Sequence, residues 1–412
     1  MAGGGSHLVP QAFVLAGGSR SQLGLLRQAR ALGHAVCVID GAETAPLFAE
    51  ADHRIVRSFA DVDGVLAELA QLGIEPVAVA TMGSDQAVLP TARLAERLGL
   101  PGLPVRTAEI VADKRKMRAA FEEAGVDSPP GRELSNLDEA RQALGEVGVP
   151  AVVKPVDGSG QRGVTEIRSA EELQAAVERA LAASRAGAAV LERYVSGDEY
   201  TVNGFLLDGE YFPMSVTRRR LHPPPPLGVC IAHRYPSNLP PDGERELFRL
   251  ADATSRAVGI ESGPSYVQVR VENGRPWTIE VGARLGGGKD AELAKLVTGF
   301  DAIRANVLWA LGELSRADFD PGEPTAPCGQ VRFVVAQPGP ITRLDAAPAL
   351  ELDGVHEAGF YWQEGMVLPP LTSGAERLGY LLLTAGDETE LDARTERALE
   401  ALVVEIAAEQ LV

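Results

Sequence analysis

The chain has few cysteines and a deficit of positive charge. Its 412 residues include three cysteines, Cys37, Cys230 and Cys328, and no two of them have CxxC spacing. An odd, unclustered set of this kind indicates a reduced, cytosolic protein without a zinc site. There are 39 Lys and Arg against 57 Asp and Glu, for a formal net charge of −18. This balance argues against a nucleic-acid or anionic-membrane partner, since both require clustered basic residues.

Long apolar runs are also missing. No run approaches the roughly 20 residues that span a bilayer, and the N-terminal MAGGGSHLVP lacks the apolar core of a signal peptide. A cytoplasmic protein is therefore expected. The sequence shows no plausible Ser-His-Asp or Cys-His pattern, which disfavours catalysis by a protein nucleophile. With 45% hydrophobic residues, the chain is long enough for two or three domains.

The first 112 residues alternate strands and helices. Residues 11–40 read as strand, glycine turn, amphipathic helix and strand, and residues 76–100 repeat the scheme. Such alternation predicts a Rossmann-like parallel sheet in an α/β fold. Gly17 and Gly18 lie where a dinucleotide fingerprint would, but GxGxxG is absent, so a tight turn packing helix on strand is favoured.

Later segments mix strands and helices less regularly. A strand follows Pro150, and residues 189–220 read as strands joined at Asp208-Gly209. The segment LHPPPPLG, residues 221–228, cannot form regular structure and is expected to be a loop able to cover a substrate. From about residue 316, short strands and a last helix over residues 396–412 are expected.

The stretch VVKPVDGSGQRGV, residues 152–164, joins a lysine to a glycine-rich loop. The lysine precedes the glycines, so this is not a Walker P-loop. Gly158, Gly160 and Gly163 would let backbone N–H groups approach a phosphate, and Lys154 would supply charge. A Gly-Ser-Gly turn with a solvated lysine is the commoner explanation of such a stretch, and both readings stay open on these residues alone.

A hairpin at residues 266–282 carries a stronger signal. Both arms have apolar residues at odd positions: Val267, Val269 and Val271 on the first, and Trp277, Ile279 and Val281 on the second. Both arms bury their odd positions only if facing residue numbers have an even sum, which predicts a three- or five-residue loop rather than a two-residue Asn273-Gly274 turn. The opposite face then carries Gln268, Arg270, Thr278 and Glu280. A carboxylate beside an amide oxygen suits a hard cation, although an ordinary polar face is the plainer alternative.

Taken together, the motifs resemble the ATP-grasp superfamily. They occur in the family's order: Lys114, then VVKP with GSGQRGV, then ERYVSGDE, then VQV with IEVGARLGG. The likeness runs from residue 12 to about 312 and looks closest to carboxylate–amine ligases of the dipeptide-ligase kind. It implies an N-terminal Rossmann-like domain (1–112), an ATP-grasp module of two α+β subdomains (113–195 and 196–315) and a small C-terminal α+β domain (316–412).

The resemblance also assigns roles to residues. The implied ATP-binding residues are Lys114, Lys154, Gly158, Ser159, Gly160, Gly163, Glu192, Arg193, Tyr194, Val195 and Glu199. Glu192 is expected near the adenine amino group, Glu199 at the ribose, and the backbone of 193–195 at adenine. Gln268 and Glu280 are the implied ligands of magnesium or manganese. Lys154 and Arg284 are the implied catalytic residues, and the implied substrate-binding residues are His233, Arg284, Gly286 and Gly287.

Two positions depart from the family pattern. Gln268 stands where many members have Glu, although carbamoyl phosphate synthase, another member, also has Gln there. Gly282 stands where many members have Asn and offers no side-chain ligand. The second difference implies that one of two magnesium ions is held more weakly, or by water.

The resemblance implies an ATP-dependent ligase that joins a small carboxylate, with an amino acid expected, to an amine through an acyl-phosphate. A purine-pathway ligase or carboxylase using carboxyphosphate is the alternative among enzymes. A nucleotide-binding regulator without activity is the alternative from another class, although the retained Lys154, Glu280 and Arg284 argue against it. A Rossmann oxidoreductase is more distant. Family members are commonly homodimers, so a homodimer is a further expectation.

Overall fold

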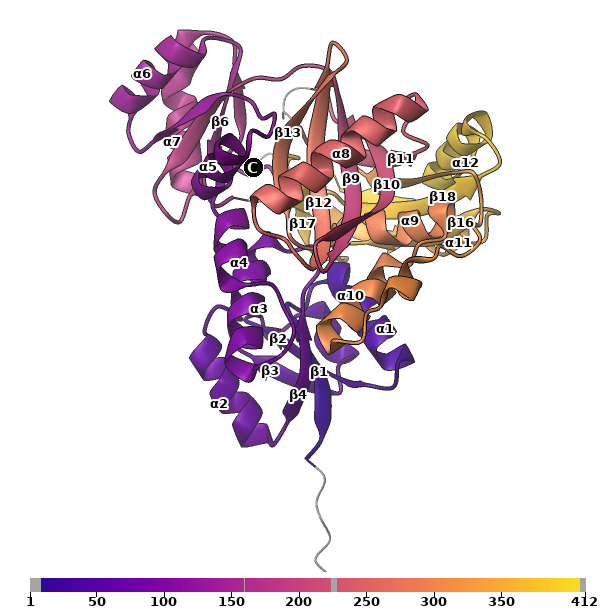
Figure 1. Cartoon of the computed structure of the whole chain (residues 1–412). Coiled ribbons are helices and arrows are strands. Elements are labelled where there is room, and N and C mark those ends of the chain that lie inside the picture. Colours follow the sequence, from indigo (N-terminus) through magenta and orange to yellow (C-terminus); the bar gives the residue numbers. More distant parts are fainter. Residues whose placement is uncertain (1–8, 159, 224–227, 408–412) are drawn as a thin grey trace, which may run out of the picture.

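The computed structural model describes residues 9–158, 160–223 and 228–407, so Ser159 and residues 224–227 of the predicted loop lie outside it. Within these ranges the strands form four sheets. In Figure 1 two lobes of strands and helices lie above an N-terminal layer formed by residues 11–98. None of the described helices combines the length and apolar character required to cross a membrane.

The N-terminal sheet is parallel, as the alternating pattern predicts. Its strand order is β3-β2-β1-β4, and all pairs are parallel. Its elements are β1 (Gln11–Ala16), α1 (Leu23–Ala31), β2 (Ala35–Asp40), β3 (His53–Val56), α2 (Val62–Leu72), β4 (Glu75–Ala80) and α3 (Asp85–Leu98). The turn after β1 is filled by Gln22, whose amide donates to the Ala16 carbonyl at 2.8 Å. A Cβ at Gly17 would lie 2.1 Å from that amide, so this glycine serves packing.

A second, four-stranded sheet forms a separate lobe. Helices α4 (Val105–Val111) and α5 (Lys114–Ala124) lead into it. Its order is β5-β8-β6-β7, with all pairs antiparallel. Its elements are β5 (Gly131–Leu134), α6 (Leu137–Val147), β6 (Ala151–Pro155), β7 (Thr165–Ile167), α7 (Leu173–Ala183) and β8 (Ala189–Arg193). The lobe has its own apolar core, in which both helices pack on the sheet.

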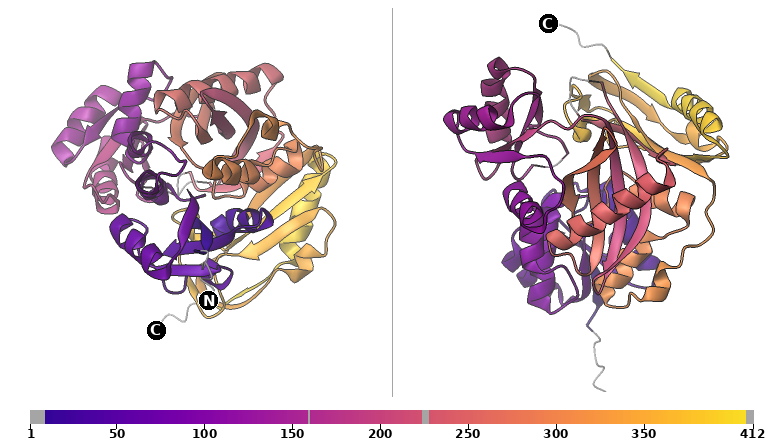
Figure 2. Two further views of the ribbon diagram at one scale, coloured as in Figure 1. Left: turned by 60° about the horizontal axis from the view of Figure 1, so that its bottom comes forward. Right: turned by 45° about the horizontal axis from the view of Figure 1, so that its top comes forward.

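The largest sheet has eight strands in the order β13-β12-β9-β10-β11-β14-β18-β16. Its elements before residue 315 are β9 (Asp198–Leu207), β10 (Glu210–Leu221), β11 (Cys230–Tyr235), α8 (Pro241–Ala257), β12 (Gly263–Glu272), β13 (Arg275–Gly282), α9 (Asp290–Thr298) and α10 (Ala302–Leu311). As predicted, β9 and β10 are joined at Asp208-Gly209, both with positive φ. In Figure 2 the lobe with α6 and α7 projects from one end of this sheet, and α12 (Glu388–Ala401) lies toward the other.

The C-terminal strands divide between two sheets. Strands β14 (Cys328–Val334), β16 (Val355–Phe360) and β18 (Gly379–Ala385) continue the eight-stranded sheet. Strands β15 (Gly339–Asp345), β17 (Val367–Leu368) and β19 (Val403–Ile406) form the fourth sheet. Short helix α11 (Ala347–Leu350) packs near α12. The sheet thus crosses residue 315, while the boundaries at 112, 195 and 315 stay predictions.

The prediction of a last helix over residues 396–412 is wrong. The helix, α12, begins at Glu388 and ends at Ala401. Residues 403–406 instead form β19, which pairs with β15 in the fourth sheet. The β-branched run Val403, Val404 and Ile406 suits a strand, so pairing and propensity outweigh the helical charge pattern that precedes it.

The predicted loop length of three or five residues in the hairpin is also wrong, and a β-bulge explains the difference. Glu272 pairs with Arg275, so Asn273-Gly274 is a two-residue turn, with φ of 53° and 79°. The register shifts between Gln268 and Val269, which face Glu280 and Thr278. Ile279 is the extra residue. Gln268 and Glu280 therefore share a face as predicted, but Thr278 lies with Val269 on the other face, toward α8.

The two faces of the sheet differ in chemistry. Tyr200, Val202, Val267, Val269 and Val281 join α8 in one apolar core. The alternate residues are polar and include Glu199, Thr201, Thr217, Arg219, Gln268 and Glu280. Because alternate side chains of a strand point to opposite faces, covering one face with α8 leaves the other for a site.

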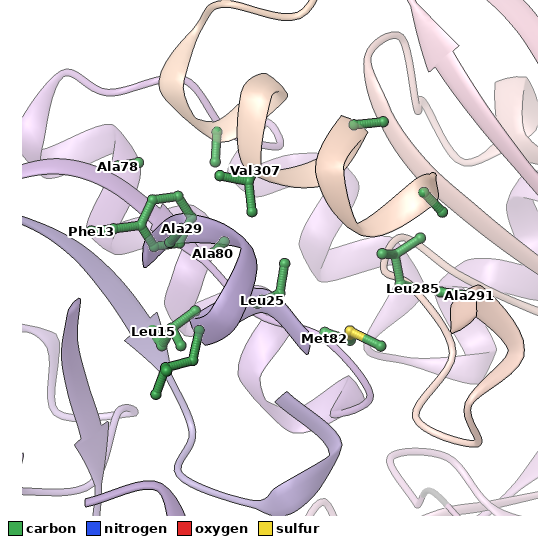
Figure 3. Close-up of a cluster of buried hydrophobic side chains, with 14 of the residues drawn as sticks. Phe13, Leu15, Leu25, Ala29, Ala78, Ala80, Met82, Leu285, Ala291 and Val307 are labelled. Carbon is green, nitrogen blue, oxygen red and sulfur yellow. The ribbon is translucent and has the colours of Figure 1, made fainter. Parts of the chain in front are cut away.

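A shared apolar core anchors the loop between β13 and α9. Leu285 and Ala291, which flank the glycine stretch, lie among Leu25 of α1, Met82 and Val307 of α10 (Figure 3). The Gly83 amide also donates to the Leu285 carbonyl at 3.0 Å. The N-terminal layer therefore fixes the position of this loop, including Arg284 beside Leu285.

Thr278 and Thr254 of α8 form a buried hydroxyl pair, with oxygens 3.0 Å apart. We expect Thr278→Val to lower the free energy of unfolding by about 1–3 kcal/mol, because the Thr254 hydroxyl loses its partner. The Thr254→Val/Thr278→Val double variant should lose less than the sum of the single changes. Urea unfolding measures all three. Strict additivity would show that the hydroxyls are not coupled.

Candidate active site

A cavity of about 110 Å³ lies between the four-stranded lobe and the polar face of the eight-stranded sheet. Most of the residues predicted to bind nucleotide and metal line it: Lys114, Lys154, Gly158, Gly160, Glu192, Arg193, Tyr194, Val195, Glu199, Gln268 and Glu280. Ile279, the bulge residue, also lines it, which corrects its predicted place in the core. These residues come from four separate stretches of sequence, and the fold brings them together.

A second cavity of about 210 Å³ adjoins the first. The two share Lys114, Gly158 and Glu280, and the second also contains Arg284. Gly163 lies in neither lining; with φ of 73°, it packs where a Cβ would come 2.7 Å from that of Ala183. Ser159 lies outside the described residues. The arrangement offers two adjoining spaces with a lysine and a carboxylate at their junction.

Lys154, at the end of β6, is buried among other charges. It is 5% exposed, and its Nζ lies 2.7 Å from Oε2 of Glu192. Arg118 of α5 holds the other oxygen of Glu192 at 2.6 Å. Burial lowers the pKa of Lys154, and the charge of Glu192 opposes this shift. Arg118 was not predicted, although it lies one helical turn after Lys114, where its side chain shares the same helix face.

Lys114 connects the glycine loop to the sheet. Its Nζ donates to the Gly158 carbonyl at 2.9 Å and lies 3.5 Å from Oε2 of Glu280. Burial raises the pKa of Glu280, but Lys114, Lys154 and Arg284 outweigh it, so the pKa falls below its usual value. Glu280 is therefore held as a carboxylate, the form that binds cations.

Gln268 and Glu280 lie directly opposite each other on β12 and β13. Such pairs have Cβ atoms about 5 Å apart, so both oxygens can reach one ion. In the part of the chain that the structure describes, no cluster of three or more His, Cys, Asp and Glu residues suits a metal. The pair nevertheless fits magnesium, which commonly takes one or two protein oxygens and completes its shell with phosphate and water.

Glu199 has two arginine partners, from β10 and β12. Arg219 lies 2.9 Å and Arg270 3.0 Å from its oxygens. Arg270 also donates to the Val195 carbonyl at 2.8 Å, and its guanidinium lies 5.2 Å from the centre of the Tyr194 ring. These contacts fix the backbone that was predicted to face adenine. The sequence predicted only the sheet face on which Arg270 lies. It predicted neither the ion pair with Glu199 nor the contacts with Tyr194 and Val195.

Arg284 pairs with a residue of the N-terminal layer. Its Nη2 lies 2.7 Å from Oδ1 of Asp85, the first residue of α3, and its guanidinium lies 4.7 Å from the Tyr266 ring centre. Asp85 was not predicted. A signal existed, because it follows strand β4 at the carboxyl edge of a parallel sheet, where ligands commonly bind.

Gly286 and Gly287, predicted to bind substrate, have a packing role in this structure. A Cβ at Gly287 would lie 2.8 Å from the Gly83 Cα, and one at Gly286 would lie 2.6 Å from the Tyr266 ring. Gly287 thus lets the loop approach the N-terminal layer closely, and Gly286 lets it approach Tyr266 of β12. Contact with substrate stays a prediction for both.

His233, also predicted at the substrate side, belongs to a buried group of three side chains. Its Nδ1 lies 3.0 Å from Oδ1 of Asp290 at the start of α9, and its Nε2 lies 3.6 Å from the Cys230 sulfur. All three residues are buried. The sequence predicted no Cys-His arrangement, and the structure shows that this is wrong. Cys230 and His233 lie three residues apart on β11 and are in contact, and Asp290 comes from a distant helix.

The group holds opposite charges. Burial raises the pKa of Cys230, but His233 and Arg219 outweigh it and lower the pKa to about 6. Burial lowers the pKa of His233, but Asp290 and Cys230 raise it to about 9. Both shifts favour a thiolate on Cys230 and an imidazolium on His233. By contrast, burial raises the pKa of the Cys37 thiol to about 12.

We expect Cys230→Ser to lower the pKa of His233, because the thiolate that favours the imidazolium is removed. The stabilisation from the charged imidazole is full below pH 6.5 and disappears as pH rises through about 9. In the variant this loss should occur at lower pH. NMR titration of the His233 ring measures the change, with Cys37→Ser as the control. An unchanged pKa would show that Cys230 does not carry charge.

The glycine loop contacts two distant segments. Gly160 accepts a hydrogen bond from the Gly374 amide at 3.1 Å, and the Gln161 side chain donates to the Gly228 carbonyl. The loop therefore touches both the C-terminal region and the end of the proline-rich segment. Gly160, Gln161 and Gly228 also line the first cavity.

Comparisons with known proteins agree with this arrangement. Residues 147–292 match the ATP-grasp domain, residues 26–102 the ATP-grasp N-terminal domain, and residues 332–407 the L-amino acid ligase C-terminal domain 2. An alanine–anticapsin ligase of Bacillus subtilis is 29% identical over 56% of this chain, and the match spans about half, 53%, of that relative's own length.

Solved structures share the fold over nearly the whole chain. The L-amino acid ligase of Bacillus licheniformis has a TM-score of 0.83 at 21% identity, covering 97% of this chain and 99% of its own. The phosphoribosylglycinamide synthetase of Anaerococcus prevotii has a TM-score of 0.76 at 17% identity, covering 96% and 99%. At these identities the structures establish the fold alone, whereas the family matches carry the classification. The chain therefore carries an ATP-grasp domain with an ATP-grasp N-terminal domain before it, and it is similar to ATP-dependent carboxylate–amine ligases.

Proposed function

We propose that this protein uses ATP to join an amino-acid carboxylate to the amino group of a second substrate. One observation carries the proposal: two cavities adjoin, and Lys114, Gly158 and Glu280 belong to both. The first cavity suits the nucleotide, and the second suits the acid and the amine. The transferring phosphoryl group would lie at their junction.

The residues divide by the part of ATP that they would hold. Glu192 and the backbone of residues 193–195 would contact adenine, and Glu199 would accept hydrogen bonds from ribose. Lys114, Lys154 and the glycine loop would surround the phosphates. Gln268 and Glu280 would hold magnesium, which neutralises phosphate charge during phosphoryl transfer. Gly282 adds no ligand, in agreement with at most a weakly held second ion.

The reaction has two steps. A carboxylate oxygen attacks the γ-phosphorus, and the bond to the β-γ bridging oxygen breaks, giving an acyl-phosphate and ADP. The amine nitrogen then attacks the acyl carbon, phosphate leaves, and the nitrogen loses a proton. Arg284 lies where its guanidinium would stabilise the charge of the transferring group, and Asp85 orients it.

Family matches favour amino-acid substrates over the alternatives. The C-terminal match is to L-amino acid ligases, and one relative is named for joining alanine to anticapsin. A purine-pathway ligase or carboxylase using carboxyphosphate is the second candidate, because such enzymes share the fold. A nucleotide-binding regulator would bind ATP without releasing phosphate.

Phosphate release separates these candidates. The protein is incubated with ATP and magnesium and with pools of amino acids and small acids, and products are identified by mass spectrometry. Release that requires two amino acids and yields their amide supports the proposal. Release with bicarbonate alone would favour carboxyphosphate chemistry, and nucleotide binding without release under any pool would favour a regulator.

Lys154→Met should reduce turnover roughly a hundredfold, a loss of about 3 kcal/mol in transition-state stabilisation. The substitution also leaves Glu192 with Arg118 as its only partner, so folding must be checked by circular dichroism. Lys116→Met is a control, since Lys116 is an exposed lysine of α5 that pairs with Glu109. Turnover in Lys154→Met equal to that of the control would make the loop structural only.

Glu280→Gln should lower both magnesium affinity and turnover, because a charged ligand is lost. Gln268→Glu should keep activity or change the metal preference, because it restores the commoner ligand. Magnesium titrations of phosphate release, repeated with manganese, measure both effects. Thr278→Val is the matched control on the same strand, since its side chain faces α8. Equal magnesium dependence in Glu280→Gln and wild type would remove the metal assignment.

A further inference from the structure

Arg377 is a partly buried cation that has no carboxylate partner among the described residues. It follows the short helix Gly374–Glu376 and precedes β18. Its Nε is buried and, among the described residues, has no hydrogen-bond partner. Burial lowers the pKa of Arg377, and none of the groups that oppose this shift is an Asp or Glu. Burying a guanidinium in this way is costly unless a ligand compensates.

The position of Arg377 links it to the substrate side of the site. Its guanidinium lies 3.9 Å from the centre of the Phe333 ring, and that ring packs edge-on against His233, with centroids 5.9 Å apart. A Cβ at Gly288 would touch both Phe333 and His233. Arg377 therefore joins the C-terminal region to the glycine stretch that follows Arg284.

Other buried atoms in this region are also unpartnered. Among the described residues they include the donors Nε of Arg219 and Nη1 of Arg284 and the acceptor Oδ2 of Asp290. Arg219 and Arg284 form ion pairs with Glu199 and Asp85, whereas Arg377 has no carboxylate partner in the described part of the chain. Each unsatisfied buried group costs about 1–3 kcal/mol. A ligand with both an anionic and a cationic group would satisfy this set.

We propose that Arg377 binds a carboxylate of an amino-acid substrate, so that the C-terminal region supplies part of the substrate site. This rests on the proposed function and deepens it, because it identifies the substrate as a carboxylate that reaches beyond Arg284 toward His233. Planar guanidinium groups bind carboxylates through two parallel hydrogen bonds, which favours Arg377 for this role.

The backbone around Arg377 is held firmly enough for a receptor. The Trp362 indole donates to the Arg377 carbonyl at 3.0 Å. Three residues earlier, the Gly374 amide donates to Gly160 of the glycine loop at 3.1 Å. A carboxylate on Arg377 would therefore lie near the loop that is proposed to cover the phosphates.

The test compares Arg377→Met, Arg377→Lys and a matched control, Arg394→Met. Arg394 is an arginine of α12 in the same region that pairs with Asp353 and Glu390. We expect Arg377→Met to raise KM for one amino acid about tenfold or more, with KM for ATP unchanged, since one charge-assisted bidentate contact is lost. Arg377→Lys should recover part of the affinity, and Arg394→Met should leave both KM values unchanged.

Three results would overturn the inference. An amino-acid KM in Arg377→Met equal to that of Arg394→Met would show that Arg377 does not bind substrate. A rise in KM for ATP alone would assign Arg377 to phosphate. An equal loss of turnover in Arg377→Lys and Arg377→Met, with reduced thermal stability and unchanged KM values, would show that the residue has a structural role.

Failure of the proposed function would look different. Wild-type protein would then release no phosphate with any amino-acid pool. In that case, thermal shift with the same pools and without ATP tests Arg377 directly. Stabilisation of wild type and Arg394→Met, but not of Arg377→Met, would still support a carboxylate receptor, and equal shifts in all three would contradict it.

Discussion

Buried positive charge is the constraint on which this site depends. Phosphates and carboxylates require cations, yet those cations must also be stable before ligands arrive. The structure meets this with pairs: Lys154 with Glu192, Arg219 and Arg270 with Glu199, and Arg284 with Asp85. Because removing one member leaves an uncompensated buried charge, each pair is strongly coupled. The pairs hold cationic side chains in fixed positions, which reduces the reorganisation needed during reaction.

The fold supplies these pairs by bringing separate layers together. Asp85 belongs to the N-terminal parallel sheet, and Arg284 to the loop after β13. The apolar core around Leu285 and Met82 holds these segments in contact. On the large sheet, α8 covers one face and leaves the alternate residues free for ligands. The architecture therefore serves a ligase by presenting one polar face between two lobes.

Local pattern predicted much of this organisation. Alternating strands and helices gave the parallel sheet, and the even-sum pairing of Gln268 and Glu280 was confirmed. The predicted length of the hairpin loop and the predicted sheet face of Thr278 were wrong. A bulge at Ile279 changes the register of the two strands, and residue types do not reveal it. The family resemblance named the lysines and acidic residues now found around one cavity.

Partners from distant segments were the harder part. Arg118, Asp85 and Asp290 each lie far along the chain from the groups they contact, so spacing carries no sign of the pairing. Cys230 was assigned to an unclustered set, yet the pKa of its thiol depends on His233 and on Arg219 and Arg377 from distant segments. Tertiary electrostatics of this kind follows from the fold and not from local sequence.

The most direct test of the central claim is isotope transfer. Amino acids labelled with ¹⁸O in their carboxylates are supplied with ATP and magnesium, and the released phosphate is examined by mass spectrometry. An acyl-phosphate intermediate predicts one ¹⁸O atom in each phosphate, since the carboxylate oxygen that attacks phosphorus leaves with it. Amide formation accompanied by unlabelled phosphate would contradict the account.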